Sequence, residues 1–205
     1  DRIRIIRGSG VDLEAFYPID EPPSPPVKAL MVSRLLWSKG VGELVEAAIL
    51  LKKEGVPIEI QIAGDLDPLN PASIPPLILQ AWKDDHLVTW LGSRTDIANL
   101  YNQAHIAVLP SYREGLPKAL IEAAACGKPI VTTDVPGCRE VVTPSENGIL
   151  VSPRNAYALA MALKSLVEYP DLRLRMGKVS RRKAEEEFDE KKIITETLCV
   201  YEELK

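Results

Sequence analysis

The 205-residue sequence predicts an α/β fold with a doubly wound parallel sheet and a group of helices at its C-terminal end. Two observations support this fold class. Short apolar runs alternate along the chain with segments of helical periodicity, a pattern typical of βαβ units and a parallel sheet. From Asn155 to Lys205 the pattern is helical throughout, with breaks near Pro170 and at Phe188-Asp189. A chain of this length can bury one large hydrophobic core.

In the first half of the chain, strands are predicted where apolar runs end at turn-forming residues. The predicted strands are Ile3–Arg7, Val27–Ser33, Ile58–Ala63 and Leu87–Leu91. Helices are predicted at Glu43–Lys53 and Pro76–Lys83. Pro18–Pro26 has the composition of a stiff extended linker. The segment Asp67–Pro76 is predicted to be a loop because it carries four prolines.

The second half repeats the alternation in shorter units. Strands are predicted at His105–Leu109, at Lys128–Thr132 and, on the edge of the sheet, at Gly148–Val151. Helices are predicted at Asp96–Asn102, at Gly137–Val142 and from Pro117, which can occupy the first helical position because its missing N–H costs nothing there. About six parallel strands with interleaved helices match a Rossmann-like domain, in which ligands bind at the carboxyl ends of the strands.

The composition excludes several classes of protein. Apolar residues make up 46% and charged residues 26% of the chain, as in soluble globular proteins, and a net charge of −4 argues against nucleic-acid binding. No apolar run approaches a membrane span and no secretory signal is present, so a cytoplasmic location is expected. Three cysteines and two histidines lack the spacing of metal or redox sites. Because the sequence starts at Asp1, without methionine, we expect a fragment or a processed form of a longer protein.

The most informative segment is Arg113–Ala123, in which Glu114 and Glu122 stand eight positions apart. A Gly-Leu-Pro turn follows the first glutamate, and a helix of small and apolar residues carries the second. A strand, a glycine turn and a helix together present backbone N–H groups to an anion. Eight positions are slightly more than two helical turns, so Glu122 is expected on the same side as the turn. Glu122 alone would be an ordinary exposed helix residue, but its apolar neighbours favour a polar partner.

This segment resembles the Glu-x7-Glu motif of retaining glycosyltransferases with the GT-B fold, particularly those of family 4. The resemblance implies that Glu114, Gly115, Leu116 and Pro117 form the loop that meets the donor sugar and diphosphate. Pro117 would contribute turn geometry only, since it has no N–H. Glu122 would hold the ribose hydroxyls. The resemblance covers nearly the whole chain and implies neither a metal ion nor an organic cofactor.

Arg34 and Lys39 follow the predicted strand Val27–Ser33 and are the candidate phosphate ligands. A forked guanidinium and a compact ammonium can together neutralise the charge on a leaving nucleoside diphosphate, and the resemblance implies that role here. Taken singly, Arg34 is equally a residue at a strand end and Lys39 a surface charge. Their occurrence together with the glutamate pair favours the phosphate role.

Three further candidates follow the next two predicted strands. Gly64 comes after Ile58–Ala63, where a glycine permits close approach of the backbone to a ligand. The residue after it, Asp65, is as readily a turn residue as a ligand. The resemblance places Gly92 beside the nucleotide base, with Arg94 as a candidate for the same region.

The segment Asp65–Pro75 resembles a bacterial subset of this family, whose enzymes build capsule, lipopolysaccharide O-antigen or exopolysaccharide units on a polyprenyl-diphosphate carrier. The resemblance as a whole implies that residues 1–205 are the C-terminal, donor-binding half of a GT-B enzyme. The last helices, at about 189–205, would cross back toward an absent N-terminal domain. We therefore expect a UDP-sugar-binding domain of a retaining enzyme that transfers a hexose or N-acetylhexosamine to a glycan or polyprenyl-diphosphate-linked acceptor.

Glu114, Arg34 and Lys39 are the expected catalytic residues, and the fragment alone is expected to be inactive. The full-length enzyme is expected in the cytoplasm or at the cytoplasmic face of the membrane. The alternative is a non-catalytic nucleotide- or phosphate-binding Rossmann module. Such a module needs no acid beside a sugar, so the glutamate pair favours the transferase. An oxidoreductase is disfavoured because the glycine-rich dinucleotide fingerprint is missing.

Overall fold

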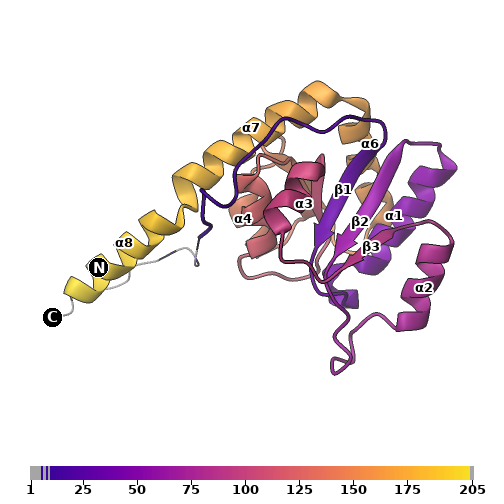
Figure 1. The fold of residues 1–205 in the computed structure, drawn as a ribbon, viewed down its shortest axis with the longest axis horizontal. Coiled ribbons are helices and arrows are strands. Elements are labelled where there is room, and N and C mark those ends of the chain that lie inside the picture. Colours follow the sequence, from indigo (N-terminus) through magenta and orange to yellow (C-terminus); the bar gives the residue numbers. More distant parts are fainter. Residues whose placement is uncertain (1–5, 7, 9, 204–205) are drawn as a thin grey trace.

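The computed structural model describes residues 6, 8 and 10–203, and it contains a six-stranded, entirely parallel sheet (Figure 1). The strands lie in the order β3-β2-β1-β4-β5-β6. Their bounds are β1 Val27–Val32, β2 Ile58–Ala63, β3 Thr89–Gly92, β4 Ile106–Leu109, β5 Ile130–Thr133 and β6 Gly148–Val151. The chain therefore builds outward from β1 in one direction and then from β4 in the other. The strand order reverses between β1 and β4, which is the arrangement of a doubly wound fold.

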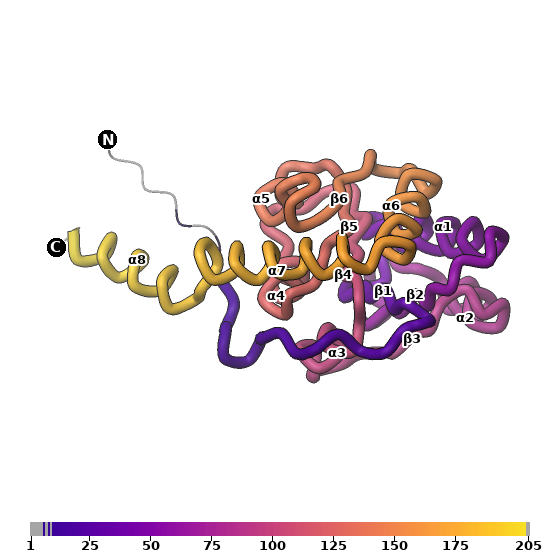
Figure 2. Tube along the Cα trace, turned by 90° about the horizontal axis from the view of Figure 1, so that it is seen from above, coloured from indigo at the N-terminus to yellow at the C-terminus, as the bar shows by residue number. Residues whose placement is uncertain are grey.

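Eight α-helices and one short 3-10 helix connect and flank the strands within the described residues. Their bounds are η1 Trp37–Lys39, α1 Val41–Lys53, α2 Pro76–Asp84, α3 Ile97–Gln103, α4 Lys118–Ala125, α5 Pro136–Val141, α6 Ala156–Glu168, α7 Pro170–Glu187 and α8 Glu190–Glu203. Helix α1 packs against α6, and α4 packs against α3 and α7. Figure 2 shows α1 and α3 on opposite sides of the strands. Both faces of the sheet are thus covered, as right-handed crossovers in two directions require.

The fold class predicted from the sequence is confirmed, and most element bounds agree within two residues. Strands β2 and β6 have the predicted bounds, β6 is an edge strand, and the C-terminal helices break at the predicted places. The prediction at Ile3–Arg7 falls largely outside the described residues. The prediction at Leu87–Leu91 starts too early, because the Leu87 amide donates to the Trp82 carbonyl at the end of α2 (2.9 Å).

Pro117 was expected as the first residue of a helix and is instead the residue before it. Helix α4 begins at Lys118, and Pro117 has extended backbone angles of φ −74° and ψ 104°. Its carbonyl accepts hydrogen bonds from the amides of Leu120 (3.0 Å) and Ile121 (3.3 Å). The proline ring thus fixes the direction in which the loop enters α4, and its carbonyl starts the helical hydrogen bonding.

The Pro-rich linker has no regular secondary structure between residues 18 and 26, as predicted, but it is fastened to the domain. The Pro22 carbonyl pairs with His105 Nε2 (3.0 Å), and the Tyr17 carbonyl accepts from the Asn102 amide (3.0 Å). Glu21 forms an ion pair with Arg173 of α7 (2.6 Å). We call residues 12–26 the connector. It runs beside α7 across the top of the molecule in Figure 1 and remains beside it in Figure 2.

The start of the connector and the α7–α8 junction lie against each other. The Val11 amide donates to the Phe188 carbonyl (2.8 Å), and the Glu190 amide donates to the Val11 carbonyl (3.1 Å). Gly10 has a φ of +72°, and a Cβ there would lie 2.8 Å from the Glu190 Cα, so only glycine fits. The chain therefore enters and leaves the domain at one point.

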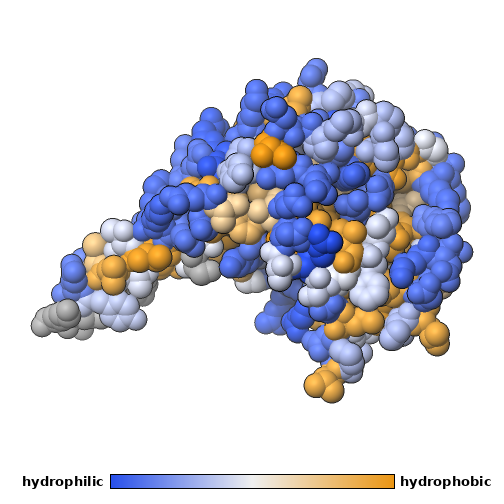
Figure 3. Space-filling model, in the orientation of Figure 1, coloured by the Kyte–Doolittle hydropathy of each residue, from blue (hydrophilic) through white to orange (hydrophobic). Residues whose placement is uncertain are grey.

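Helix α8 extends away from the domain beyond this junction (Figure 1). Phe188 and Ile193 are buried, but Ile194, Leu198 and Tyr201 are more than half exposed, at 54%, 57% and 63%. Figure 3 shows orange patches on the arm formed by α8. The helix thus carries an apolar face that the described residues leave uncovered. No helix in the described part of the chain has the length and apolar character needed to cross a membrane.

Candidate functional site

The candidate site lies at the carboxyl ends of β1 and β4, where the strand order reverses. A cavity of about 210 Å³ is formed there by the ends of both strands, η1, and the loop that enters α4. It is lined by Val32, Ser33, Arg34, Lys39, Leu109, Glu114, Pro117, Lys118 and Ala119. Open α/β sheets bind their ligands at this position. Four of the predicted site residues, Arg34, Lys39, Glu114 and Pro117, are thus brought together around one cavity.

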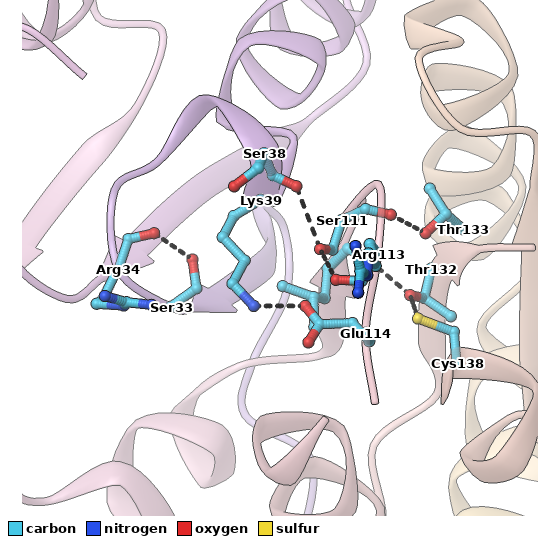
Figure 4. Close-up of polar contacts among 11 residues, drawn as sticks. Ser33, Arg34, Ser38, Lys39, Ser111, Arg113, Glu114, Thr132, Thr133 and Cys138 are labelled. Atoms are coloured by element: carbon cyan, nitrogen blue, oxygen red, sulfur yellow. Dashed lines mark hydrogen bonds and ion pairs between the residues drawn. The ribbon is translucent and has the colours of Figure 1, made fainter. Parts of the chain in front are cut away.

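Lys39 and Glu114 form the central charged pair of the site (Figure 4). Lys39 Nζ lies 2.6 Å from Glu114 Oε1, and the two side chains are 24% and 10% exposed. Gly40 brings the two segments together, because a Cβ at this position would lie 2.1 Å from the Pro110 carbonyl oxygen and its φ is +76°. Because η1 approaches the end of β4 closely, Lys39 contacts Glu114 although the two residues are 75 positions apart in the sequence.

Hydroxyl groups hold the loop that carries Glu114. Ser111 Oγ donates to the carbonyls of Ser38 and Arg113, both at 3.2 Å. Thr133, at the end of β5, donates to the Ser111 carbonyl, and Thr132 donates to the Leu109 carbonyl (2.6 Å). The loop is thus tied to η1 on one side and to β5 on the other (Figure 4).

Gly137 in α5 supports the same loop from behind and was not recognised as a site residue from the sequence. A Cβ at Gly137 would lie 2.1 Å from the Gly115 carbonyl oxygen and 2.5 Å from the Glu114 carbonyl oxygen. Only a residue without a side chain therefore lets α5 touch the backbone of the loop. A signal was available, since Gly137 directly follows a Val-Pro step after the predicted strand Lys128–Thr132.

The amides of Gly115 and Leu116 extend this site toward solvent. Among residues 6, 8 and 10–203, neither amide has a protein acceptor. Gly115 is exposed, and a Cβ there would meet nothing within 4 Å. Two donors at the end of a loop, next to an ammonium group, form a place where an anionic oxygen can bind.

Arg34 lines the cavity from the end of β1 and is paired with a carboxylate that the sequence analysis did not select. Its Nη1 lies 2.8 Å from Asp67 Oδ2, with side-chain exposures of 62% and 28%. Asp67 lies in the predicted loop after β2, and its amide donates a hydrogen bond to Ser73 Oγ (3.0 Å). An exposed ion pair of this kind contributes little to stability and is easily exchanged for another anion.

Glu122 lies one level deeper on α4 and does not line the cavity. Its side chain is 14% exposed, and its Oε1 lies 3.8 Å from Nζ of Lys118, which does line the cavity. Burial raises the pKa of Glu122, an effect that the nearby Lys118 ammonium partly opposes. Glu122 was expected on the loop side of α4, and the contact that the structure gives it is the one with Lys118, one turn earlier on the helix.

Gly64, Gly92 and Arg94 do not line this cavity. A Cβ at Gly64 would lie 1.9 Å from the Ser33 carbonyl oxygen, and the Gly64 amide donates to the Gly92 carbonyl (2.8 Å), so Gly64 packs the ends of β1 and β2 together. Arg94 makes a two-pronged contact with Asp96, at 2.8 Å and 2.7 Å, before α3. This contact holds the pKa of Asp96 far below its usual range. Leu116 also contributes no side chain to the cavity.

One Asp-x-Asp spacing, typical of divalent-metal motifs, does occur in the sequence, at Asp65-Leu66-Asp67. The two residues do not form a shared site, because Asp67 binds Arg34 and the exposed Asp65 contributes its carbonyl to the Leu35 amide (2.9 Å). Over the part of the chain that the structure describes, no group of three or more His, Cys, Asp or Glu side chains is placed to hold a metal ion.

Comparisons with known proteins identify the family of the chain. Residues 16–183 match the family model described as "Glycosyl transferases group 1". A Campylobacter jejuni relative, N,N'-diacetylbacillosaminyl-diphospho-undecaprenol alpha-1,3-N-acetylgalactosaminyltransferase, is 33% identical over 218 residues, which cover 98% of this chain and 54% of the relative. The chain spans about half the length of the curated relatives that it matches.

Solved structures show the same architecture. Sucrose-phosphate synthase from Thermosynechococcus elongatus superposes with a TM-score of 0.84 at 27% identity, covering 98% of this chain and 52% of that one. Anabaena HepE in complex with UDP superposes with a TM-score of 0.78 at 23% identity, covering 93% of this chain and 56% of that one. Together with the match over residues 16–183, these likenesses show that the chain belongs to the glycosyl transferases group 1 family.

Proposed function

We propose that this chain is the donor-binding, C-terminal domain of a GT-B glycosyltransferase and that its donor is a UDP-sugar. The observation that carries the proposal is the cavity at the switch point of the sheet, where Lys39 is paired with Glu114 and Arg34 lies on the same wall. The two unpaired loop amides beside this pair complete a site for a diphosphate attached to a sugar. The family to which the chain belongs supports the reading, and so does the UDP that HepE binds.

The charges of the cavity suit a diphosphate that gains negative charge as its bond to the sugar breaks. Lys39 has three N–H donors and uses one on Glu114, so the others remain for phosphate oxygens. Arg34 can exchange its exposed contact with Asp67 for a bidentate contact with phosphate. In a transfer that retains the anomeric configuration, these cations would stabilise the departing diphosphate, while Glu114 positions the sugar.

Glu122 is proposed to bind the ribose. It lies on α4, the helix that follows the loop, one turn after Lys118. The half-buried Glu122 carboxylate has Lys118 as its ion-pair partner, at 3.8 Å, so its oxygens can still accept hydrogen bonds from hydroxyl groups. The acceptor is proposed to be a glycan or a polyprenyl-diphosphate-linked sugar, bound mainly by a preceding domain. The name of the Campylobacter relative, which acts on an undecaprenol-linked diphosphate, supports this choice. The apolar face of α8 is proposed to pack against that preceding domain.

The direct test is a calorimetric titration of the chain with UDP and with UDP-sugars, in EDTA and again with magnesium or manganese. We expect binding in EDTA, because Arg34 and Lys39 supply the positive charge, and we expect the sugar to add affinity through Glu114. A Glu114→Gln variant should then lose the difference between UDP and UDP-sugar while still binding UDP. Binding that disappears in EDTA and returns with the metal would contradict this account. No difference between UDP and UDP-sugar would instead favour a non-catalytic nucleotide-binding module.

Replacing Glu122 with glutamine is expected to weaken UDP binding by about 1–3 kcal/mol, the range for hydrogen bonds to a charged group. A 2′,3′-dideoxy nucleotide should bind wild type and Glu122→Gln almost equally. The pKa of Glu122 is raised by burial, and ribose hydroxyls favour its charged form, so the wild-type advantage should shrink as the pH falls through that pKa. The measurement is the ratio of the UDP affinities of wild type and Glu122→Gln at several pH values. Protonation of the phosphate changes both affinities equally and so does not change this ratio. Equal loss of affinity in both proteins on removal of the hydroxyls would place the ribose elsewhere.

A further inference from the structure

A second cavity, of about 340 Å³, lies at the opposite end of the sheet from the candidate donor site. It opens between the connector, α7 and the residues that precede β4 and β5, and Figure 2 shows the connector and α7 bounding this region. His105 stands directly before β4, and Lys128 and Pro129 stand directly before β5. Glu114 follows β4, so the two cavities are separated by the length of these central strands.

Lys128 is the unusual residue of this second cavity. The residue is only 4% exposed, yet no ion pair or hydrogen bond is found for its ammonium group among the described residues. Burial lowers its pKa, and the opposing attraction of Cys126 and Glu21 does not offset this. A lysine this little exposed ordinarily has an anionic or hydrogen-bonding partner, because the loss of hydration is costly. Lys128 lines the cavity, so that partner can come from a ligand.

Three titratable side chains of the lining, those of Glu21, Arg173 and His105, do not pair with Lys128, because they are hydrogen-bonded to each other or to the backbone. Glu21 receives two bonds from Arg173, at 2.6 Å and 3.1 Å, and Arg173 also donates to the Leu166 carbonyl (2.7 Å). His105 uses both ring nitrogens, one toward the Lys28 amide (2.9 Å) and the other toward the Pro22 carbonyl. These hydrogen-bonded residues surround Lys128, whose ammonium group has no such partner in the described part of the chain.

The cavity has two more cations and an apolar wall. Arg181 is held by the carbonyls of Phe16 and Ala125 (both 2.8 Å), and Lys178 is exposed at the rim. Asp20 is the remaining acid of the lining and is exposed. The apolar part of the lining consists of Pro18, Ile19, Pro129 and Leu174.

Two glycines lie where α7 packs against the turn before β5. A Cβ at Gly177 would lie 2.2 Å from the Gly127 carbonyl oxygen, and Gly127 has a φ of +66°. Helix α7 therefore touches the turn that precedes Lys128 without a side chain between them. This contact fixes the position of the cation relative to the apolar wall.

We propose that this cavity binds a small organic anion, whose carboxylate or phosphate group pairs with Lys128 and whose apolar part lies against Pro18, Pro129 and Leu174. The volume lies within the range of small-molecule sites, and the lining combines an apolar wall with charged groups that can fix the orientation of a ligand. The site is independent of the proposed donor site, since no residue lines both cavities.

The test uses three probes with the same six-carbon chain: hexyl phosphate, hexanoate and uncharged hexan-1-ol. Each is titrated into the ¹⁵N-labelled chain, and the amide shifts of Gly127 and Gly177 report on this cavity, while those of Gly115 and Gly137 report on the donor site. We expect one or both anions to shift the first pair saturably, with hexan-1-ol at least about tenfold weaker because it cannot pair with the ammonium. The tighter anion identifies the head group.

Three variants make the result decisive. Lys128→Met should reduce anion affinity at least about tenfold. Leu174→Glu, at an exposed position on the rim, should weaken it by repulsion without affecting the core. Lys53→Met, an exposed lysine at the end of α1, removes the same charge elsewhere and should change nothing. The proposal fails if neither anion shifts Gly127 and Gly177, if hexan-1-ol binds as tightly, or if Lys128→Met binds the anions like wild type.

Discussion

Replacing Gly137 with alanine is expected to reduce binding of UDP-sugar by tenfold or more. The new Cβ would lie 2.1 Å from the Gly115 carbonyl oxygen, so either α5 or the Glu114 loop has to move. Gly137 has no positive φ, so the alanine itself fits α5 and the clash alone causes the effect. Overpacking of this kind costs about 1–3 kcal/mol, which corresponds to roughly one to two orders of magnitude in affinity if the loop yields.

Calorimetry with UDP-sugar measures the loss, and thermal unfolding shows whether the fold is affected. Gly42→Ala is the matched control, because Gly42 is also the second residue of a helix and its added Cβ would meet only the Trp37 side chain, at 3.1 Å. Gly42→Ala should bind UDP-sugar like wild type. If Gly137→Ala also does, the loop is not held by α5 in the way the structure indicates.

Removing Lys39 is expected to have the largest effect on turnover in the full-length enzyme. Lys39→Ala should depress kcat, since negative charge on the diphosphate grows as the bond to the sugar breaks. A contact made equally in the ground state would instead raise KM. Lys39→Ala also leaves Glu114, which is 10% exposed, without its 2.6 Å partner, so the free energy of unfolding should fall by about 1–3 kcal/mol.

The double variant Lys39→Ala/Glu114→Gln separates these two effects. It removes the unpaired buried charge, so stability should be partly restored while turnover remains low. Glu114→Gln alone should impair transfer more than it weakens UDP binding, because Glu114 is proposed to contact the sugar. Full turnover together with a lower affinity for UDP in Glu114→Gln would assign Glu114 to the nucleotide instead.

The sequence was sufficient to predict the fold class because the central strands can be recognised as short, continuous apolar runs. Strands β4 and β5 are buried along their whole length, and their apolar runs are bounded by Pro110 and Lys128. The start of β3 was misplaced because periodicity does not show that the Leu87 amide closes the end of α2. The position of Pro117 was off by one residue for a similar reason, since a proline suits both the first helical position and the position before it.

The sequence named four residues that line the candidate cavity, but it did not show how they pair. The sequence selected Lys39 and Glu114 separately, and it selected Arg34 without its partner Asp67. Such pairings arise from loop geometry, here the approach of Gly40 to Pro110, which no local pattern records. Gly137 was missed because its role depends on the backbone of the Glu114 loop, which packs against it and is distant in the sequence. Arg173, buried at 2% exposure on a mostly polar helix, likewise depends on a partner 152 residues away.

The hydrogen bonds that join Val11 to Phe188 and Glu190 have a mechanical consequence. In the proposed two-domain enzyme, both segments that connect the domains would meet at this junction, because Gly10 lets them touch without a side chain between them. The junction is therefore the expected pivot for any movement of one domain relative to the other.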